Sequence, residues 1–190
     1  DTWGVDFAFL DRDDQLVGNP FHYRDPRTNG VLGKAFAVVE REEIFERTGI
    51  QFMQLNSLFQ MFVMRGSSAL ECAKTYLMVP DLFNFWFTGE KANEYSDATT
   101  TQFYNPILKK YDGELLAKMG LPTDIYPEIV PPGTNLGSLL KSVAEDTGLP
   151  QISVIAPACH DTGSAVAAVP MKNPRAAYIS SGTWSLVGVA

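Results

Sequence analysis

The chain has 190 residues, of which 45% are hydrophobic and 19% are charged. This apolar content suffices for a sizeable core and excludes an intrinsically disordered protein. Its 15 basic and 22 acidic residues give a formal net charge of -7, and because no basic stripe is visible we expect no nucleic-acid partner. Cys72 and Cys159 are its two cysteines, which excludes a disulfide scaffold, and two histidines are too few for a histidine-rich metal site.

The sequence also bears on location and on the ends of the chain. Every apolar stretch is interrupted well before the roughly 20 residues that a membrane-spanning helix needs, and the chain does not open with the pattern of a signal peptide. We therefore expect a cytoplasmic protein without a membrane partner. The chain starts at Asp1 without a methionine, and both ends look like strands instead of polar tails. Both ends are therefore expected to be cut from a longer protein.

The first thirty residues are predicted to form a hairpin and a loop. Residues 5–10 have the pattern of a strand, 11–14 of a polar turn and 15–23 of a second strand. Proline, asparagine and glycine make 24–30 a loop. The cluster of Arg24, Asp25 and Arg27 in this loop is a candidate for holding an anion, although loop charges are usually solvated.

Helices are predicted where residues suit a helix and a glycine follows the last turn. These segments are 31–47, 57–64, 80–88, 114–119 and 136–146. The aromatic run 83–87 is expected to lie in the core. The polar segment 93–105 is expected to be a loop with at most a short helix, and the proline-rich segment 127–133 a connector.

The pattern changes after residue 150. Residues 152–156 have the pattern of a buried strand, and the small residues 164–168 suit a tightly packed helix start. Residues 176–180 and 184–189 flank Ser181, Gly182 and Thr183, which predicts a second hairpin. Strands near both ends that enclose several helices predict an α/β fold.

The strongest candidate for chemistry is Asp161, which lies between His160 and Thr162 where the predicted strand gives way to a helix. Ligands usually bind at this edge of an α/β sheet, and a carboxylate there can take a proton from a substrate hydroxyl. The alternative is a helix N-cap, which the spacing alone favours. Cys159 and His160 are not expected to form a nucleophile pair, because neighbours in an extended segment point to opposite faces.

Two further segments have a functional and a structural interpretation. The turn at Gly182 and Thr183 can direct backbone N–H groups at phosphate oxygens, although an ordinary hairpin turn is the simpler interpretation. Trp3 and Gly4 can offer an apolar wall and a close backbone approach to a sugar, or form a core tryptophan over a bulge. The motifs GxGxxG, GxxxxGK[ST], HExxH and GxSxG do not occur in the sequence.

Several longer motifs occur together and in the order of a known family. They are DTWGVDF (1–7), YRDPRT (23–28), TGIQFM (48–53), VPDLFNFWFTGE (79–90), EYSDATTTQ (94–102), HDT (160–162) and SSGTWSLVG (180–188). With this combination the chain resembles the FGGY carbohydrate kinases along nearly its whole length. The resemblance implies the actin-like ATPase fold, in which two ribonuclease-H-like domains enclose a cleft.

The resemblance also implies an activity, namely transfer of the γ-phosphoryl group of ATP, with Mg²⁺, to a ketose. The 1-hydroxyl of L-rhamnulose is the implied acceptor, with L-fuculose, D-xylulose and D-ribulose as alternatives. Asp161 is the implied general base, and Thr183 is implied to lie against the nucleotide phosphates. The implied sugar contacts are Trp3, Gly4, His160, Asp161 and Thr162, and no residue is assigned to a metal ion.

The resemblance divides the chain into residues 1–170, a sugar-binding N-terminal domain, and 171–190, the first hairpin of a nucleotide-binding domain. The family's first phosphate hairpin and its adenosine-binding region have no match in the chain, so the chain by itself is expected to be inactive. Gly163 stands where relatives commonly carry alanine. The alternative is a non-catalytic sugar-binding or interaction module, and the oligomeric state stays open.

Overall fold

Two buried strands form the centre of the molecule. In the computed structural model, which describes residues 1–173 and 175–189, β1 (Phe7–Leu10) pairs antiparallel with β2 (Thr75–Met78). Phe7 lies opposite Met78, and Leu10 lies opposite Thr75. Every residue of both strands is buried, which accounts for their nearly continuous apolar sequences.

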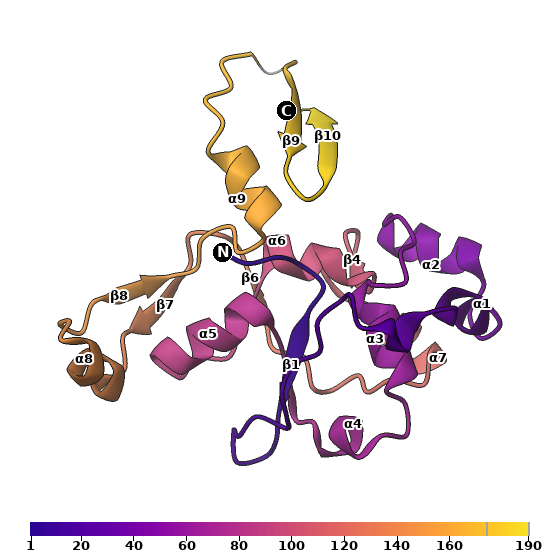
Figure 1. Cartoon of the computed structure of the whole chain (residues 1–190), viewed down its shortest axis with the longest axis horizontal. Helices are drawn as coiled ribbons and strands as arrows, with labels where there is room; N and C mark the ends of the chain where they lie inside the picture. The colour runs from indigo at the N-terminus through magenta and orange to yellow at the C-terminus, as the bar shows by residue number, and fades with distance from the viewer. Residues whose placement is uncertain (174, 190) are drawn as a thin grey trace.

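Helices beside this pair of strands complete the main core. They are η1 (a 3₁₀ turn, Pro26–Thr28), α1 (Val31–Phe36), α2 (Arg41–Thr48), α3 (Ser57–Val63), α4 (Ser68–Cys72) and α7 (Gly113–Lys118). Apolar side chains from the five α-helices of this group belong to the same core cluster as Phe7, Phe9 and Tyr76 of the strands. Gly49 ends α2 in the left-handed conformation (φ 68°), as predicted for a glycine after the last turn. Figure 1 shows α1, α2 and α3 grouped on one side of β1.

The hairpin predicted over residues 5–23 is confirmed at its turn, where the Asp11 N–H donates to the Gln15 carbonyl (2.9 Å), but its second strand is not formed. The partner of β1 is β2, which comes from much later in the chain. Residues 15–23 contact β1 through a bridge between Leu10 and Leu16 and a hydrogen bond from the Val17 N–H to the Phe9 carbonyl (2.9 Å). A strand cannot continue from there, because Gly18 is left-handed (φ 122°) and Pro20 has no N–H.

α5 (Val79–Thr88) follows β2 directly and buries one stripe of its surface. Leu82 and Phe85, three residues apart, pack on the β1 and β2 side chains. The prediction that the aromatic run 83–87 lies in the core is confirmed for Phe85 only, because Phe83, Trp86 and Phe87 are 40–45% exposed. The Phe83 ring contacts the rings of Trp86 (5.3 Å between centres) and Phe87 (6.4 Å), so the three form an exposed aromatic cluster on the helix.

The segment expected to be a polar loop is part of the folded interior. It forms β3 (Asn93–Glu94), α6 (Tyr95–Ala98), η2 (Thr99–Thr101) and β4 (Tyr104–Asn105), and β4 pairs with β5 (Lys110–Tyr111), which follows the segment. Asn93, Glu94, Asp97, Thr101 and Gln102 are buried despite their polar side chains. Several are hydrogen-bonded inside the protein: Gln102 Nε2 donates to the Ile50 carbonyl (2.9 Å), for example. The expectation of a short helix is confirmed, but the loop interpretation is otherwise wrong.

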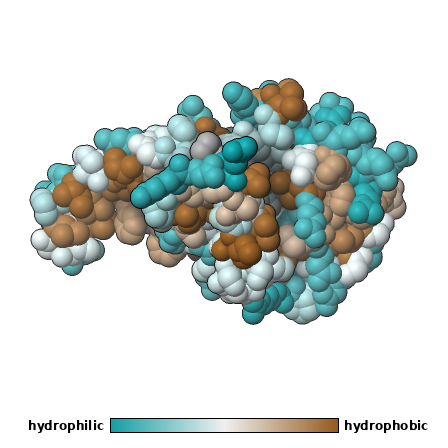
Figure 2. Space-filling model, turned by 90° about the horizontal axis from the view of Figure 1, so that it is seen from above, coloured by the Kyte–Doolittle hydropathy of each residue, from teal (hydrophilic) through white to brown (hydrophobic). Residues whose placement is uncertain are grey.

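An arm extends from this core, as Figure 1 shows. β6 (Ile129–Val130), which pairs in parallel with β3 of the core, leads into the arm, and the arm contains β7 (Asn135–Ser138), α8 (Lys141–Thr147) and β8 (Ser153–Ile155). The predicted helix over 136–146 is wrong in its first half, where left-handed Gly137 (φ 103°) lies in β7. β8 pairs with β7 but is not buried, since Ile155 is 49% exposed. Figure 2 shows hydrophobic patches among hydrophilic ones on the arm.

The last elements lie above the core in Figure 1. α9 (Asp161–Ala167) follows the arm, and β9 (Ala177–Ser181) and β10 (Ser185–Val189) form an antiparallel hairpin. Ser181 lies opposite Ser185, so the predicted second hairpin is confirmed. None of the helices in the described residues is long and apolar enough to cross a membrane.

Candidate active site

Backbone hydrogen bonds join the start of the chain to the start of α9. Thr2 bridges to His160 in parallel: its N–H donates to the Cys159 carbonyl (2.8 Å), and its carbonyl accepts from the Asp161 N–H (2.7 Å). Residues separated by about 160 positions are thereby held side by side. This bridge brings Trp3 next to the segment with the strongest candidate residue.

A cavity of about 600 Å³ lies at this junction and reaches the turn of the β9–β10 hairpin. This volume is typical of small-molecule sites. The sequence-predicted site residues all line it, namely Trp3, Gly4, His160, Asp161, Thr162 and Thr183. Further lining residues that sequence reasoning did not assign include Val5, Tyr23, Asn56, Thr100 and Trp184. Asn56 and Thr100 lie in or beside quoted motifs, which was the only available signal for them.

The carboxyl group of Asp161 is open to the cavity. Its side chain is 56% exposed. One oxygen, Oδ1, accepts from the Thr162 N–H (2.5 Å) and the Thr162 hydroxyl (3.2 Å), whereas Oδ2 accepts no hydrogen bond from the described residues. The N-cap of α9 is His160, and Asp161 is the first helical residue. Asp161 is therefore not the N-cap residue itself, although its Oδ1 accepts from an N–H of the first turn, and Oδ2 stays available for a ligand proton.

The loop before Asp161 is held in place by hydrogen bonds to Glu94, a buried acidic residue, and to Ser96. Glu94 Oε2 accepts from the Cys159 N–H (2.8 Å), and the Ser96 hydroxyl accepts from the His160 N–H (3.1 Å). Burial lowers the pKa of His160 in spite of nearby Asp161 and Glu94, so its imidazole is neutral near pH 7. A neutral imidazole can both donate and accept a hydrogen bond.

Cys159 has no role as a nucleophile in this geometry. Its side chain is buried, and burial raises the pKa of its thiol to about 12. A thiolate at neutral pH is therefore excluded. This agrees with the expectation that Cys159 and His160 do not act as a pair.

The indole of Trp3 forms part of the cavity wall. Its Nε1 donates to Asp6 Oδ2 (2.7 Å), and the buried Asp6 carboxylate also accepts from the Tyr23 N–H (3.1 Å) and Gln60 Nε2 (3.1 Å). The Trp3 side chain is 42% exposed, so the alternative of a core tryptophan is wrong. An indole held in this way offers a fixed apolar face.

The two arginines of the 24–30 loop have different surroundings. Arg27 Nη2 donates to Gln60 Oε1 (2.7 Å), and its guanidinium carbon lies 3.9 Å from the centre of the Phe21 ring. Arg24 lines a smaller cavity of about 440 Å³, which Thr183 also lines. The two side chains are therefore not brought together as one anion site.

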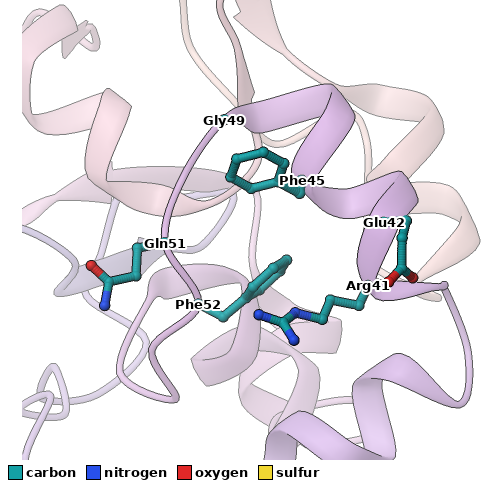
Figure 3. A pocket seen from close by; sticks show the side chains of 6 residues that line it. All are labelled: Arg41, Glu42, Phe45, Gly49, Gln51 and Phe52. Atoms are coloured by element: carbon teal, nitrogen blue, oxygen red, sulfur yellow. The ribbon is translucent and has the colours of Figure 1, made fainter.

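A separate depression of about 490 Å³ lies on the outer face of α2. Figure 3 shows the rings of Phe45 and Phe52 facing each other across it, with the side chain of Arg41 beside Phe52. The Arg41 guanidinium carbon is 5.1 Å from the centre of the Phe52 ring. None of the sequence-predicted site residues lines this depression.

A Mg²⁺ site would need several oxygen ligands that converge on one point. Across residues 1–173 and 175–189, no group of three or more His, Cys, Asp or Glu side chains is placed to hold a metal ion. We therefore assign no residue of this chain to Mg²⁺.

Comparison with known families gives one match that spans most of the chain. Residues 2–168 match the model described as the FGGY family of carbohydrate kinases, N-terminal domain. A rhamnulokinase from Oceanobacillus iheyensis is 44% identical over the whole chain, and one from Bacteroides thetaiotaomicron is 46% identical. The chain spans only 40% and 39% of the length of these two relatives.

Solved structures give the same fold at lower sequence identity. A xylulose kinase from Rhodospirillum rubrum superposes on 94% of the chain with a TM-score of 0.82 and 21% identity. A carbohydrate kinase from Novosphingobium aromaticivorans covers 97% with a TM-score of 0.79 and 22% identity. The chain corresponds to 38% and 41% of these two structures. The prediction of an α/β chain with the actin-like ATPase fold is confirmed.

Proposed function

The chain belongs to the FGGY family of carbohydrate kinases, and we propose that it forms the sugar-binding part of a cytoplasmic L-rhamnulose kinase. The reaction is transfer of the γ-phosphoryl group of ATP, supplied with Mg²⁺, to the 1-hydroxyl of the ketose. The observation that carries the proposal is the cavity in which Asp161 lies beside Trp3 and Gly4. The choice of L-rhamnulose is supported by relatives 44–46% identical that are named rhamnulokinases.

Asp161 is the proposed general base. Its free Oδ2 takes the proton of the 1-hydroxyl while that oxygen bonds to the γ-phosphorus of ATP, and ADP leaves with the electrons of the broken P–O bond. The two hydrogen bonds from Thr162 to Oδ1 hold the carboxylate in one orientation. Phosphoryl transfer is accelerated mainly by alignment of the hydroxyl with the phosphorus. On this proposal the cavity walls hold the sugar in that alignment.

The sugar contacts are proposed on the same wall. Trp3 offers its indole to the apolar face of the ketose, and the Gly4 backbone, His160 and Thr162 offer hydrogen bonds to its hydroxyls. Because the pKa of His160 is lowered, its imidazole is neutral near pH 7 and can donate or accept a hydrogen bond to the sugar.

The phosphate side is proposed to lie at the hairpin turn. The Gly182 N–H already donates to the Trp184 carbonyl (2.8 Å), so it is used inside the turn. Thr183, which lines the cavity, is therefore the residue proposed to contact the nucleotide phosphates. On this proposal residues 1–170 form the sugar-binding domain and 171–190 begin the nucleotide-binding domain.

The test is Asp161→Asn in a full-length kinase that carries this chain. We expect kcat to fall by roughly two to four orders of magnitude, because the base is lost, with an unchanged melting temperature. ADP release is measured in a coupled assay with L-rhamnulose, L-fuculose, D-xylulose and D-ribulose, and L-rhamnulose should give the highest kcat/KM.

The matched control is Asp146→Asn, which changes an exposed aspartate of α8 far along the arm. It should leave kcat unchanged. An undiminished rate in Asp161→Asn would remove this residue from the role of base, and a preference for another ketose would overturn the proposed substrate.

A further inference from the structure

Val5, between Gly4 and β1, has a backbone conformation that its side chain disfavours. Its φ of 68° lies in the left-handed region. A β-branched residue there is a clear outlier, because its side chain clashes with the neighbouring backbone. Such a conformation persists only where surrounding groups fix it. Val5 also lines the cavity, so the strain is located at the candidate site.

Three side chains hold the peptide groups of Val5. Its N–H donates to the Thr100 hydroxyl (2.9 Å). Its carbonyl accepts from the Ser57 hydroxyl (2.6 Å) and from Gln60 Nε2 (3.2 Å). Ser57 and Gln60 are buried on α3, whereas Thr100 lies in η2. We call these three side chains the Val5 clamp.

The Val5 clamp is itself anchored. The Thr100 hydroxyl donates to the Asp97 carbonyl (2.8 Å), so the same oxygen accepts from Val5 and donates within its own turn. Gln60 Nε2 also donates to Asp6 Oδ1 (3.1 Å), the carboxylate whose other oxygen accepts from the Trp3 indole. The clamp therefore connects residues on both sides of Val5.

Gly4 is pressed against the same threonine. A Cβ added to Gly4 would lie 2.7 Å from Thr100 Cγ2 and 2.9 Å from its Oγ1, which is closer than real contacts allow. The Gly4 backbone and Thr100 are therefore in direct contact. With the Val5 turn fixed, the peptide groups of Gly4 have one position in the cavity wall.

We infer that Ser57, Gln60 and Thr100 are positioning residues, which hold the strained Val5 turn so that Gly4 and Trp3 meet the sugar. The inference deepens the proposed function and rests on it for the identity of the ligand. These three residues do not need to touch the sugar themselves. Their expected effect is on KM for the sugar, with little effect on kcat or on KM for ATP.

The first test replaces Thr100 by valine, which keeps its shape and removes the hydroxyl acceptor. In the full-length kinase Thr100→Val should raise KM for L-rhamnulose about tenfold, and Thr100→Ser, which keeps the hydroxyl, should recover most of the affinity. Thr101→Val is the matched control: Thr101 also donates to a carbonyl three residues earlier (2.7 Å), but has no bond to Val5. An unchanged KM in Thr100→Val, or an equal rise in Thr101→Val, overturns the inference.

The second test combines Thr100→Val with Val5→Gly. Glycine adopts a positive φ without the steric cost that valine has. The turn at residue 5 should therefore depend less on the hydrogen bond to the Thr100 hydroxyl. The rise in KM from Thr100→Val should therefore be several-fold smaller in the Val5→Gly background. Equal effects in both backgrounds contradict a role for the strained turn.

A third measurement is independent of the proposed function. Amide hydrogen exchange at Val5, followed by NMR on the labelled chain, should be at least about tenfold faster in Thr100→Val than in the wild type. Unchanged exchange overturns the clamp even if the enzyme is active. An enzyme inactive on all four ketoses, with faster exchange in the variant, supports the clamp and counts against the proposed function alone.

Discussion

Asp97 in α6 is a carboxylic acid in a place with little to stabilise its charge. It is completely buried, and neither of its oxygens has a hydrogen-bond partner among the described residues. Burial, and then the carboxyl groups of Asp81 and Glu94, raise the pKa of Asp97 well above its ordinary value. Ionising this group in the folded protein therefore costs more than in the unfolded chain.

This raised pKa predicts that Asp97→Asn stabilises the chain at high pH. Below the ordinary pKa near 4 the acid is protonated in both states, so the variant should differ little there. As pH rises, the wild type loses stability up to the raised folded pKa, and the amide does not. We expect the variant to gain roughly 1–3 kcal/mol in free energy of unfolding at pH 8, measured by urea denaturation at several pH values.

The control for this prediction is Asp13→Asn, a change of an aspartate whose side chain is 77% exposed. It should not alter the pH dependence. A gain in Asp97→Asn that is the same at pH 4 and pH 8 would show that packing, and not charge, is responsible.

Motifs in the sequence marked several single residues that the structure brings together at one cavity. Asp161, His160 and Thr162 were predicted as a group, and the structure places them on one cavity wall. Val5 and Thr100 were not predicted, because nothing in a Gly-Val-Asp sequence indicates a left-handed valine. Such strain is fixed by side chains distant in sequence, and local propensity gives no signal for it.

At the scale of elements, one arginine connects α2 to the start of α7. Arg47 contacts Asp112 (3.2 Å), Glu43 (2.9 Å) and Glu114 (2.8 Å). Asp112 is buried and caps α7 by accepting from the Leu115 N–H (3.0 Å). Burial acts to raise the pKa of Asp112, but hydrogen bonds from Asn105, Leu115 and Arg47 outweigh it and leave the pKa lowered.

Arg47→Met is predicted to destabilise the junction of α2 and α7. It leaves the Asp112 carboxylate buried without its cation, which costs about 2 kcal/mol once solvent access to the arginine side is allowed for. Because the folded pKa of Asp112 is lowered, its stabilisation is present above a pH near 4 and is lost as pH falls through the folded pKa. The loss in Arg47→Met, measured by urea denaturation, should therefore be largest near neutrality and shrink toward acid.

Lys118→Met is the matched control for Arg47→Met. Lys118 contacts Glu43 and Glu114 in the same cluster, but it is 43% exposed and does not contact Asp112. Its loss should cause a much smaller change. Equal effects of the two substitutions would mean that buried Asp112 is not the important partner.

Helix ends were predicted well where a glycine follows the last turn, but the extent of the elements was predicted poorly where tertiary contacts decide it: the helix expected over 31–47 is interrupted between α1 and α2. α2 ends at Gly49, as its sequence indicates. Residues 93–105 are polar and were expected on the surface, yet buried partners from other segments satisfy several of them, as at Gln102. A polar sequence alone does not distinguish solvated side chains from hydrogen-bonded buried ones.

At the scale of the molecule, strands predicted near both ends of the chain indicated the α/β class, but they did not indicate which strands pair with each other. β1 takes its partner from residues 75–78 and Thr2 pairs with His160, both over long separations in sequence. The site depends on these long-range pairings, because they bring Trp3 to Asp161. Only the order of family motifs indicated that the two segments belong to one site.

The isolated 190-residue chain is predicted to show no turnover of ATP with L-rhamnulose. It spans 39–40% of the length of the two rhamnulokinases to which it was compared, and phosphoryl transfer needs aligned groups on both the sugar and the nucleotide. The chain and a full-length kinase that contains it are compared in the coupled assay, and calorimetry with L-rhamnulose is run on both. ATP- and sugar-dependent turnover by the chain alone would contradict the prediction. Sugar binding without turnover in the full-length protein as well would instead favour a non-catalytic sugar-binding module.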